Sequence, residues 1–226
     1  MTSDATRVAR LRALDTCAVS DALDALGLVG AALGLHSVTG RHHVAGRAVT
    51  LELVEAGTVT APRHLGTAAV DASGPDDVIV VAHAGRPHVS GWGGVLSAGA
   101  RRRGIEAIVV DGAVRDVDEA TALGLPVFAV TGVPVTARSR VVERDWNIDV
   151  EIAGIAVRPG DYVVADGSGV VFVPAGSIDA VLDKAELVVA KERAMVERVD
   201  QGIPMVDVMG ADYEILLTTT QKDTSR

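Results

Sequence analysis

The sequence is poor in cysteine and in long apolar runs. Its single cysteine, Cys17, excludes an internal disulfide and a zinc cluster built from cysteines. No window approaches the ~20 apolar residues that a membrane helix requires. Residues 1–15 also lack the apolar core of a signal peptide. We therefore expect a cytoplasmic protein that makes no contact with a membrane.

Aromatic residues are equally scarce, and positive charge is outweighed by negative charge. Only 3% of the residues are aromatic, the net charge is −9, and the isoelectric point is about 5.1. An acidic surface repels a phosphate backbone, and base stacking requires aromatic side chains. The composition therefore predicts that nucleic acid is not a partner.

Lysine is nearly absent. The only lysines are Lys184, Lys191 and Lys222, all in the last quarter of the chain. An aldolase that works through a Schiff base needs a desolvated lysine in its site. If this protein makes or breaks a carbon–carbon bond beside a carbonyl, a metal ion must therefore polarise that carbonyl.

The residues that are present predict one α/β domain over residues 1–226, since 48% are hydrophobic and no linker or repeat interrupts the chain. Residues 1–29 form an N-terminal helical segment, and residues 177–226 form a long helix and an arm. The predicted helices are 8–14, 20–27 (capped by Ser20), 65–72 and 178–199 (capped by Ser177). The predicted strands are 44–54, 77–82, 126–130, 150–155, 162–165 and 169–174, whereas 30–38 and 138–148 are predicted as loops and the last six residues as frayed.

The chain is organised around residues 91–119, GWGGVLSAGARRRGIEAIVVDGAVRDVDE. Gly93 and Gly94 open a helix that Gly104 ends in a left-handed cap. The apolar run 105–110 then predicts a buried strand, which the pair 111–112 ends. Arg115 and Asp116 begin the next helix, which extends to residue 124. Two helix N-termini should therefore meet at one edge of a sheet.

This edge has the chemistry of a small-anion site. Free backbone N–H groups at the start of the first helix can hold an anion, and Arg115 can grip a carboxylate in two places. Asp116 is a hard oxygen ligand suited to Mg²⁺ or Mn²⁺. The predicted site binds a 2-oxo acid, and its residues are Gly93, Gly94, Val95, Leu96, Arg115 and Asp116. A plain turn and a solvated charge pair are the alternatives.

The sequence disfavours two other kinds of site. A dinucleotide site is disfavoured because Leu96 replaces the third glycine of G-x-G-x-x-G, and because 83–90 should separate the preceding strand from the glycines. No histidine has the spacing of a metal site: residues 42 and 43 are predicted at the surface, and His83, His88 and Trp92 in an exposed loop.

The central stretch resembles a known family. Gly94 is followed after twenty residues by Arg115 and Asp116, and then by Glu119. The similarity extends to SDALDALG at 20–27, GRAVT at 46–50, PVFAVTG at 126–132 and VRPGDYVVADGSGVVFVP at 157–174. These motifs resemble the RraA-like family, which includes the 4-hydroxy-4-methyl-2-oxoglutarate / 4-carboxy-4-hydroxy-2-oxoadipate aldolases and the regulators of RNase E activity.

The resemblance implies a swivelling β/β/α fold, and homotrimers or homohexamers with sites at subunit interfaces. We expect a metal-dependent lyase that acts on a 2-oxo acid through a pyruvate enolate, with Asp116 as the metal ligand and Arg115 holding the substrate. Glu119 could orient Arg115 or a metal-bound water, and Glu192 of a neighbouring subunit could complete the site.

One position departs from the aldolases of the family, which often carry an acidic residue where this chain has Gly94. A glycine there resembles the regulators, whereas the long helix after residue 174 resembles the enzymes. The alternative function is a protein–protein regulator of a ribonuclease with no chemistry of its own. A methyltransferase is excluded because no glycine-rich methyl-donor loop leads to an acidic strand end.

Overall fold

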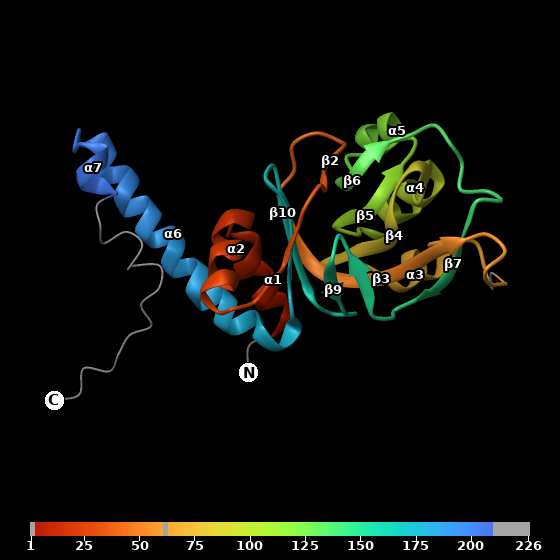
Figure 1. Ribbon diagram of the computed structural model, residues 1–226, viewed down its shortest axis with the longest axis horizontal. Helices are drawn as coiled ribbons and strands as arrows, with labels where there is room; N and C mark the ends of the chain where they lie inside the picture. The colour runs from red at the N-terminus through yellow and green to blue at the C-terminus, as the bar shows by residue number, and fades with distance from the viewer. Residues whose placement is uncertain (1–2, 61–62, 210–226) are drawn as a thin grey trace.

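The computed structural model describes residues 3–60 and 63–209, which form a single mixed α/β domain (Figure 1). The helices are α1 (Asp4–Arg12), α2 (Thr16–Ala25), α3 (Thr67–Ala72), α4 (Gly94–Arg103), α5 (Val117–Ala122), the 3₁₀ turn η1 (Ala175–Ser177), α6 (Ile178–Asp200) and α7 (Met205–Val208). The strands are β1 (Ala31–Ala32), β2 (His36–Ser37), β3 (Val44–Glu55), β4 (Asp77–Ser90), β5 (Ala107–Val114), β6 (Val127–Gly132), β7 (Val141–Trp146), β8 (Val150–Ile152), β9 (Ile155–Val157), β10 (Tyr162–Asp166) and β11 (Gly169–Val173).

One sheet organises the domain. Its strand order is β1-β11-β10-β3-β4-β5-β6-β2, and β7 also pairs with β3. Strands β3, β4, β5 and β6 run parallel, and the crossovers between them contain α3, α4 and α5. Because the carboxyl ends of parallel strands lie at one edge, the turns that follow β4 and β5 come together there.

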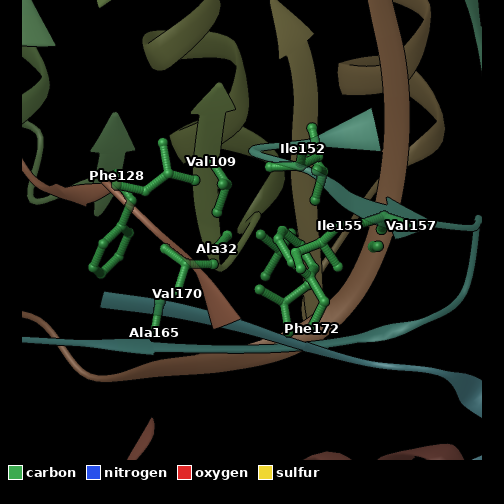
Figure 2. Close-up of a cluster of buried hydrophobic side chains, with 14 of the residues drawn as sticks. Ala32, Val109, Phe128, Ile152, Ile155, Val157, Ala165, Val170 and Phe172 are labelled. Atoms are coloured by element: carbon green, nitrogen blue, oxygen red, sulfur yellow. The ribbon is translucent and has the colours of Figure 1, made fainter. Parts of the chain in front are cut away.

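Three apolar clusters hold the layers together. The first lies inside the curled sheet, where Phe128 and Phe172 pack with residues of the β8–β9 hairpin (Figure 2). The second packs α3, α4 and α5 onto one face of β3, β4 and β5, and the third packs α1, α2 and α6 onto β10 and β11. Helices therefore cover both sides of the molecule, as Figure 1 shows, and the site edge belongs to the second layer.

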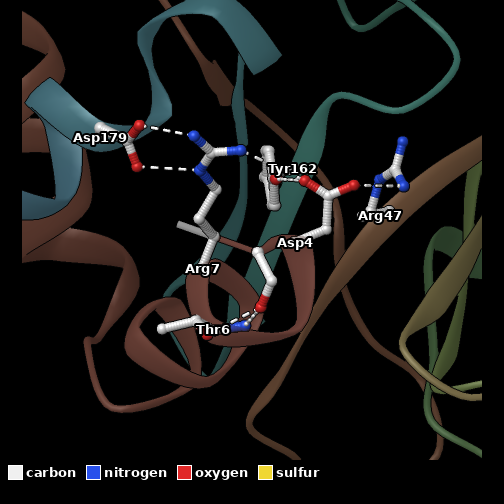
Figure 3. A network of polar contacts seen from close by, with 7 residues as sticks. Asp4, Thr6, Arg7, Arg47, Tyr162 and Asp179 are labelled. Carbon is white, nitrogen blue, oxygen red and sulfur yellow. Dashed lines mark hydrogen bonds and ion pairs between the residues drawn. The ribbon is translucent and has the colours of Figure 1, made fainter. Parts of the chain in front are cut away.

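The helix layer on β10 and β11 carries a network of ion pairs (Figure 3). Arg7 grips Asp179 of α6 through two hydrogen bonds of 2.8 and 2.6 Å. Asp4 accepts hydrogen bonds from the hydroxyl of Tyr162 and from Arg47, both at 2.8 Å. These contacts attach the first helix of the chain to both the sheet and α6.

Most of the predicted elements are confirmed, and α4 begins and ends at the predicted glycines, with Gly104 left-handed at φ 75. One predicted cap is wrong, and the other is confirmed in position only. Helix α2 begins at residue 16, because Asp15 accepts the N–H of Ala18 at 2.8 Å, so Ser20 lies inside the helix. Ser177 precedes α6 but makes no side-chain cap hydrogen bond.

Strands extend into segments that were predicted as turns or loops. Strand β5 continues through Asp111 and Gly112, which were expected to end it, because all eight of its residues are buried. Gly112 has φ 151, and a Cβ there would overlap the ring of His83 on β4, so only glycine allows the two strands to approach. Strand β7 lies within 138–148, and β1 and β2 lie within 30–38.

The C-terminal helix α6 extends away from the domain (Figure 1). Its first half is buried against α1 and α2, whereas Leu187, Val196 and Val199 expose 59%, 58% and 40% of their surface. The self-association expected from this helix stays a prediction that light scattering tests. The described part of the predicted arm contains α7; the expected fraying of the last six residues falls outside the described residues. Among the helices described, none has the length and apolar character needed to cross a membrane.

Candidate active site

The glycine turn and the Arg–Asp turn meet, as predicted. Gly93 is the N-cap of α4, with extended backbone at φ −156 and ψ −176. A Cβ on Gly93 would lie 3.0 Å from Oδ2 of Asp116 and 3.1 Å from Nε of Arg115. The main chain also joins the turns, since the N–H of Arg115 donates to the carbonyl of Trp92 at 3.0 Å. The absence of a side chain at residue 93 is thus what allows this approach.

Asp116 caps the neighbouring helix rather than its own. It precedes α5 with left-handed backbone, at φ 59 and ψ 39, and makes no cap hydrogen bond to that helix. Its Oδ2 instead accepts the N–H of Gly94 at 2.8 Å and lies 3.2 Å from Nε of Arg115. A left-handed aspartate costs conformational energy, so this turn is held in place by the contacts around it.

The predicted anion cradle is therefore only partly open. The N–H of Gly94 already donates to Asp116, whereas within 3–60 and 63–209 no group accepts from the N–H of Val95 or Leu96. The side chain of Arg115 is 39% exposed, and over the same ranges its two terminal nitrogens have no hydrogen-bond partner. Two N–H groups and a guanidinium fork thus remain available to an anion.

A cavity of about 580 Å³ lies against this edge. One wall is the start of α4, residues 93–96, together with Arg115; the others are residues 63–67 before and at the start of α3, and residues 136–143 around the start of β7. Asp116 does not line the cavity: it is 31% exposed and lies beside the same helix N-terminus. The substrate-holding residues predicted from sequence therefore share one cavity, with the predicted metal ligand next to it.

A second carboxylate lies beside Asp116. A Cβ on Gly94 would overlap Oε2 of Glu119, so the Glu119 carboxylate occupies the space that a side chain at residue 94 would fill. Two carboxylates fit Mg²⁺ or Mn²⁺, which bind few protein ligands and keep waters and substrate oxygens. Across the described residues no group of three or more His, Cys, Asp or Glu could hold a metal ion, so a closed, all-protein metal cage is not part of this region.

Glu192 lies in a different setting within the chain. It is on α6, and its pKa is raised by partial burial and by the charges of Asp15 and Asp21. Its role in the site of a neighbouring subunit stays a prediction.

Sequence reasoning missed the acidic residue in the cavity wall. Glu143 of β7 is completely buried; its Oε2 accepts the N–H of Gly66 at 2.7 Å, and its Oε1 lies 3.3 Å from Nη1 of Arg63. In the structure, burial alternates at the start of β7 and places residues 141 and 143 on the inner face, but the sequence Val141-Val142-Glu143 has no matching alternation of apolar and polar residues. The mixed charges of 138–148 indicated a loop instead.

Two residues predicted in an exposed loop are buried. His83 lies within β4, its Nε2 is 2.8 Å from the carbonyl oxygen of Val89, and burial lowers its pKa, which favours the neutral ring. Trp92 is 2% exposed and donates its ring N–H to Ser97 at 3.1 Å. The prediction was wrong because β4 continues to residue 90, so a strand does lead into the glycine turn; Leu96 remains the mismatch to a dinucleotide site. His88 is exposed, as predicted.

The chain is similar to known proteins in sequence and in fold. Residues 16–172 match the RraA-like family, described as Aldolase/RraA. The uncharacterized protein MJ0644 of Methanocaldococcus jannaschii is 34% identical over 128 residues, or 57% of this chain and 61% of that protein. Protein DlpA of Legionella pneumophila is 30% identical over 166 residues, 74% of this chain, but the chain spans only 27% of its length.

Other similarities extend over almost the whole chain. A Halalkalibacterium halodurans protein named "Putative 4-hydroxy-4-methyl-2-oxoglutarate aldolase" is 28% identical over 87% of this chain and 90% of its own length. An uncharacterized protein from Pseudomonas syringae has a crystal structure with a TM-score of 0.83 at 28% identity, covering 93% of this chain and all of that one. Streptomyces coelicolor RraAS2, described as an unusual member of the RNase ES inhibitor RraA family, gives 0.76 at 26% identity over 88% of this chain and 98% of that one. The chain belongs to the RraA-like family.

Proposed function

We propose that this protein is a divalent-metal-dependent lyase that cleaves a 2-oxo acid through a pyruvate enolate. The reaction is retro-aldol cleavage of a 4-hydroxy-2-oxo acid, decarboxylation of an oxaloacetate-like acid, or both. The observation that carries the proposal is the open guanidinium of Arg115 beside the open N–H groups of Val95 and Leu96, at one wall of a cavity of about 580 Å³. The family and the name of its aldolase relative support the same chemistry.

The chain's own residues bind and orient the acid. The two terminal nitrogens of Arg115 match the two oxygens of a carboxylate, and the N–H groups at the start of α4 add hydrogen bonds where the helix dipole favours negative charge. Because Trp92 and Asp116 hold Arg115 at its N–H and its Nε, the guanidinium loses little freedom when it binds. The carboxylate and the adjoining oxo group are thereby fixed against the helix.

Asp116 is the residue that would hold the metal ion, with Glu119 next to it. A divalent cation there would supply the positive charge that polarises the 2-oxo group. Oδ1 of Asp116 accepts no hydrogen bond within the described parts of the chain, so this oxygen is available to a cation. Neither of the lysines on α6 lines the cavity, so the described residues supply no amine there for Schiff-base chemistry.

The test is release of pyruvate from a 4-hydroxy-2-oxo diacid and from oxaloacetate, followed by coupling to lactate dehydrogenase. We expect turnover with Mg²⁺ or Mn²⁺ and none after EDTA treatment, restored on adding the metal back. The blank is the decarboxylation of oxaloacetate by free metal ion in the absence of protein. Turnover that persists in EDTA, or no turnover of any 2-oxo acid, would contradict the proposal.

A second candidate is a ribonuclease regulator with no chemistry of its own. It is favoured by Gly94, where aldolases of the family often carry an acidic residue, and by similarity to RraAS2. The Glu119 carboxylate beside Gly94 favours the lyase. Inhibition of a purified RNase E-type enzyme by the wild-type protein and by Arg115→Ala alike, without pyruvate release, would favour the regulator.

A further inference from the structure

We infer that Arg63 binds a second anionic group of the substrate, and that the buried carboxylate of Glu143 positions Arg63 for this task. The inference rests on the proposed lyase function and adds the residue that selects 2-oxo acids with a charge at their far end. It starts from the ion pair in the cavity wall between the buried carboxylate of Glu143 and the partly exposed Arg63.

Burying the carboxylate of Glu143 carries a large desolvation cost. A carboxylate without contact to water costs several kcal/mol unless it is paired and hydrogen-bonded. Here both oxygens are used: one accepts the N–H of Gly66, and the other faces Arg63. On β7, Glu143 pairs with Leu53 of β3, next to a bulge. A well-packed apolar residue at such a position stabilises a sheet at least as well as a buried ion pair does. The charge therefore has a local task, which is to hold residues 63–66 against β7.

Arg63 is held on one side only. Its Nη1 lies 3.3 Å from Oε1 of Glu143, while 34% of its side chain remains exposed and the residue lines the cavity. A guanidinium has five N–H donors in a rigid plane, and no other partner for them occurs in the described chain. A fork anchored at one nitrogen and open at the others is prepared for a carboxylate.

The cavity has the size and charge for a ligand with two anionic ends. Its volume of about 580 Å³ falls within the ~300–1,000 Å³ typical of sites for much larger molecules than a three-carbon acid. The lining contains Arg63, Arg115 and Arg138 against the single acidic residue Glu143, in a protein whose net charge is −9. Arg115 belongs to the α4 wall and Arg63 to the wall before α3, so the cationic groups come from different sides of one space.

The experiment compares two five-carbon acids that differ only in the far end. Binding of 2-oxoglutarate, a diacid, and 2-oxopentanoate, a monoacid, is measured by calorimetry with Mg²⁺ present, with pyruvate as the short probe. Wild-type protein should bind the diacid more tightly than the monoacid. Arg63→Gln should reduce this preference about ten- to hundredfold, the loss typical of a charged hydrogen bond, and should change the pyruvate Kd less than about twofold.

The variant Glu143→Gln tests whether Glu143 positions Arg63 for the substrate or only stabilises the fold. We expect it to reduce the preference for the diacid while the pyruvate Kd stays unchanged; a merely structural pair would lower Tm and leave the ratio of the two Kd values as in wild type. Arg63→Lys, which keeps the charge and loses the fork, should give an intermediate preference. Arg144→Gln is the matched control, because Arg144 follows Glu143 on β7 but pairs with Glu52 outside the cavity lining.

The outcomes separate this inference from the proposed function. If pyruvate and the diacid bind wild-type protein but Arg63→Gln keeps the preference, or if Arg138→Gln alone removes it, the assignment of Arg63 is overturned and the lyase proposal stands. Wild-type protein that binds both five-carbon acids equally also overturns the assignment. If no 2-oxo acid binds at all, the inference and the proposed function fail together.

Discussion

The two helix layers use their arginines in opposite ways. In the layer of α1, α2 and α6, arginines are matched by acids: Arg7 with Asp179, and Arg10 with Glu186 at 2.8 Å (Figure 3 shows the first pair). In the layer of α3, α4 and α5, Arg115 keeps its terminal nitrogens open, and the backbone at Asp116 is strained. The first layer thus pairs Arg7 and Arg10 with acids of the chain. In the second layer Arg101 and Arg103 donate to backbone carbonyls, but the terminal nitrogens of Arg115 stay open at the cavity.

This difference separates stability from function. Partly exposed ion pairs contribute little to stability, because water screens them and the side chains lose entropy; the first layer depends mainly on its buried apolar residues. The second layer holds unpaired donors and a left-handed aspartate, which no packing requirement explains. Substitutions in the layer of α3, α4 and α5 should therefore reduce activity, whereas substitutions in the layer of α1, α2 and α6 should reduce stability.

The largest effect is expected at Asp116. Asp116→Asn keeps the hydrogen bond from Gly94 but loses the negative charge that attracts a cation, so turnover should vanish as it does in EDTA. Calorimetry should show Mg²⁺ affinity at least about tenfold lower than in wild type. Asp118→Asn, an exposed neighbour on α5, is the control and should behave as wild type. Unchanged metal affinity in Asp116→Asn would remove this residue from the metal site.

Arg115→Ala should lower kcat/KM by about 10²–10³-fold, comparable to the loss of a preorganised charge-stabilising donor, with no change in Tm beyond a degree or two. Arg115→Lys should recover little, because an ammonium group cannot bind two carboxylate oxygens in one plane. Arg102→Ala, at the opposite end of α4, serves as the control in the same kinetic assay. Wild-type kinetics in the lysine variant would contradict the two-point grip.

In the other layer, the apolar contacts should dominate. Leu182 of α6 is fully buried in the cluster with α1 and α2, so Leu182→Ala should lower the free energy of unfolding by about 2–5 kcal/mol, measured by urea denaturation. The kcat/KM of the folded fraction should equal that of wild type. Glu197→Ala, exposed on the same helix, should stay within about 0.5 kcal/mol. A loss of activity in Leu182→Ala at full folding would break the separation between the layers.

The smallest effect is expected from the ion-pair network in acid. The hydrogen bond from Tyr162, together with the charge of Arg47, lowers the pKa of Asp4 below its ordinary value of 3.8. A lowered pKa means that the folded state favours the carboxylate, so its stabilisation is present above pH ~4 and is lost as the pH falls through the folded-state pKa. Because the side chain of Asp4 is 45% exposed and water screens its charge, the contribution should be below about 1 kcal/mol. The difference in unfolding free energy between wild type and Asp4→Asn should therefore shrink from pH 6 to pH 2; a constant difference would contradict it.

Local sequence patterns predicted much of the site edge, and distant contacts limited the rest. Gly93, Gly94 and Gly104 indicate where α4 begins and ends, because caps and left-handed positions are local properties. Asp111 and Gly112 look like a turn, but burial on both faces of β5 overrides that preference. Asp15 and Ser20 are both good cap residues, so propensity alone did not identify the start of α2.

The partners of Glu143 and Asp116 were beyond the reach of pattern reasoning. Glu143 meets Gly66 across 77 positions and Asp116 meets Gly94 across 22. Each contact depends on how strands pair and on which helix end lies opposite, and this follows from the whole sheet. The sequence predicted Asp116 at the start of α5 as a metal ligand but not its hydrogen bond to the N–H of Gly94 on α4, and it left Glu143 in a loop.

The hydrogen bond between Asp116 and the N–H of Gly94 has a thermodynamic consequence. Oδ2 of Asp116 is an acceptor that suits a cation, and the N–H of Gly94 is a donor that suits an anion. In the empty site these two groups bond to each other. A cation that draws Asp116 away releases the Gly94 N–H for a carboxylate, and a carboxylate that takes this N–H releases Asp116. If a metal ion and an oxo acid bind here as proposed, linkage requires that they raise each other's affinity by the same factor, and occupancy of the site would then depend on both concentrations together.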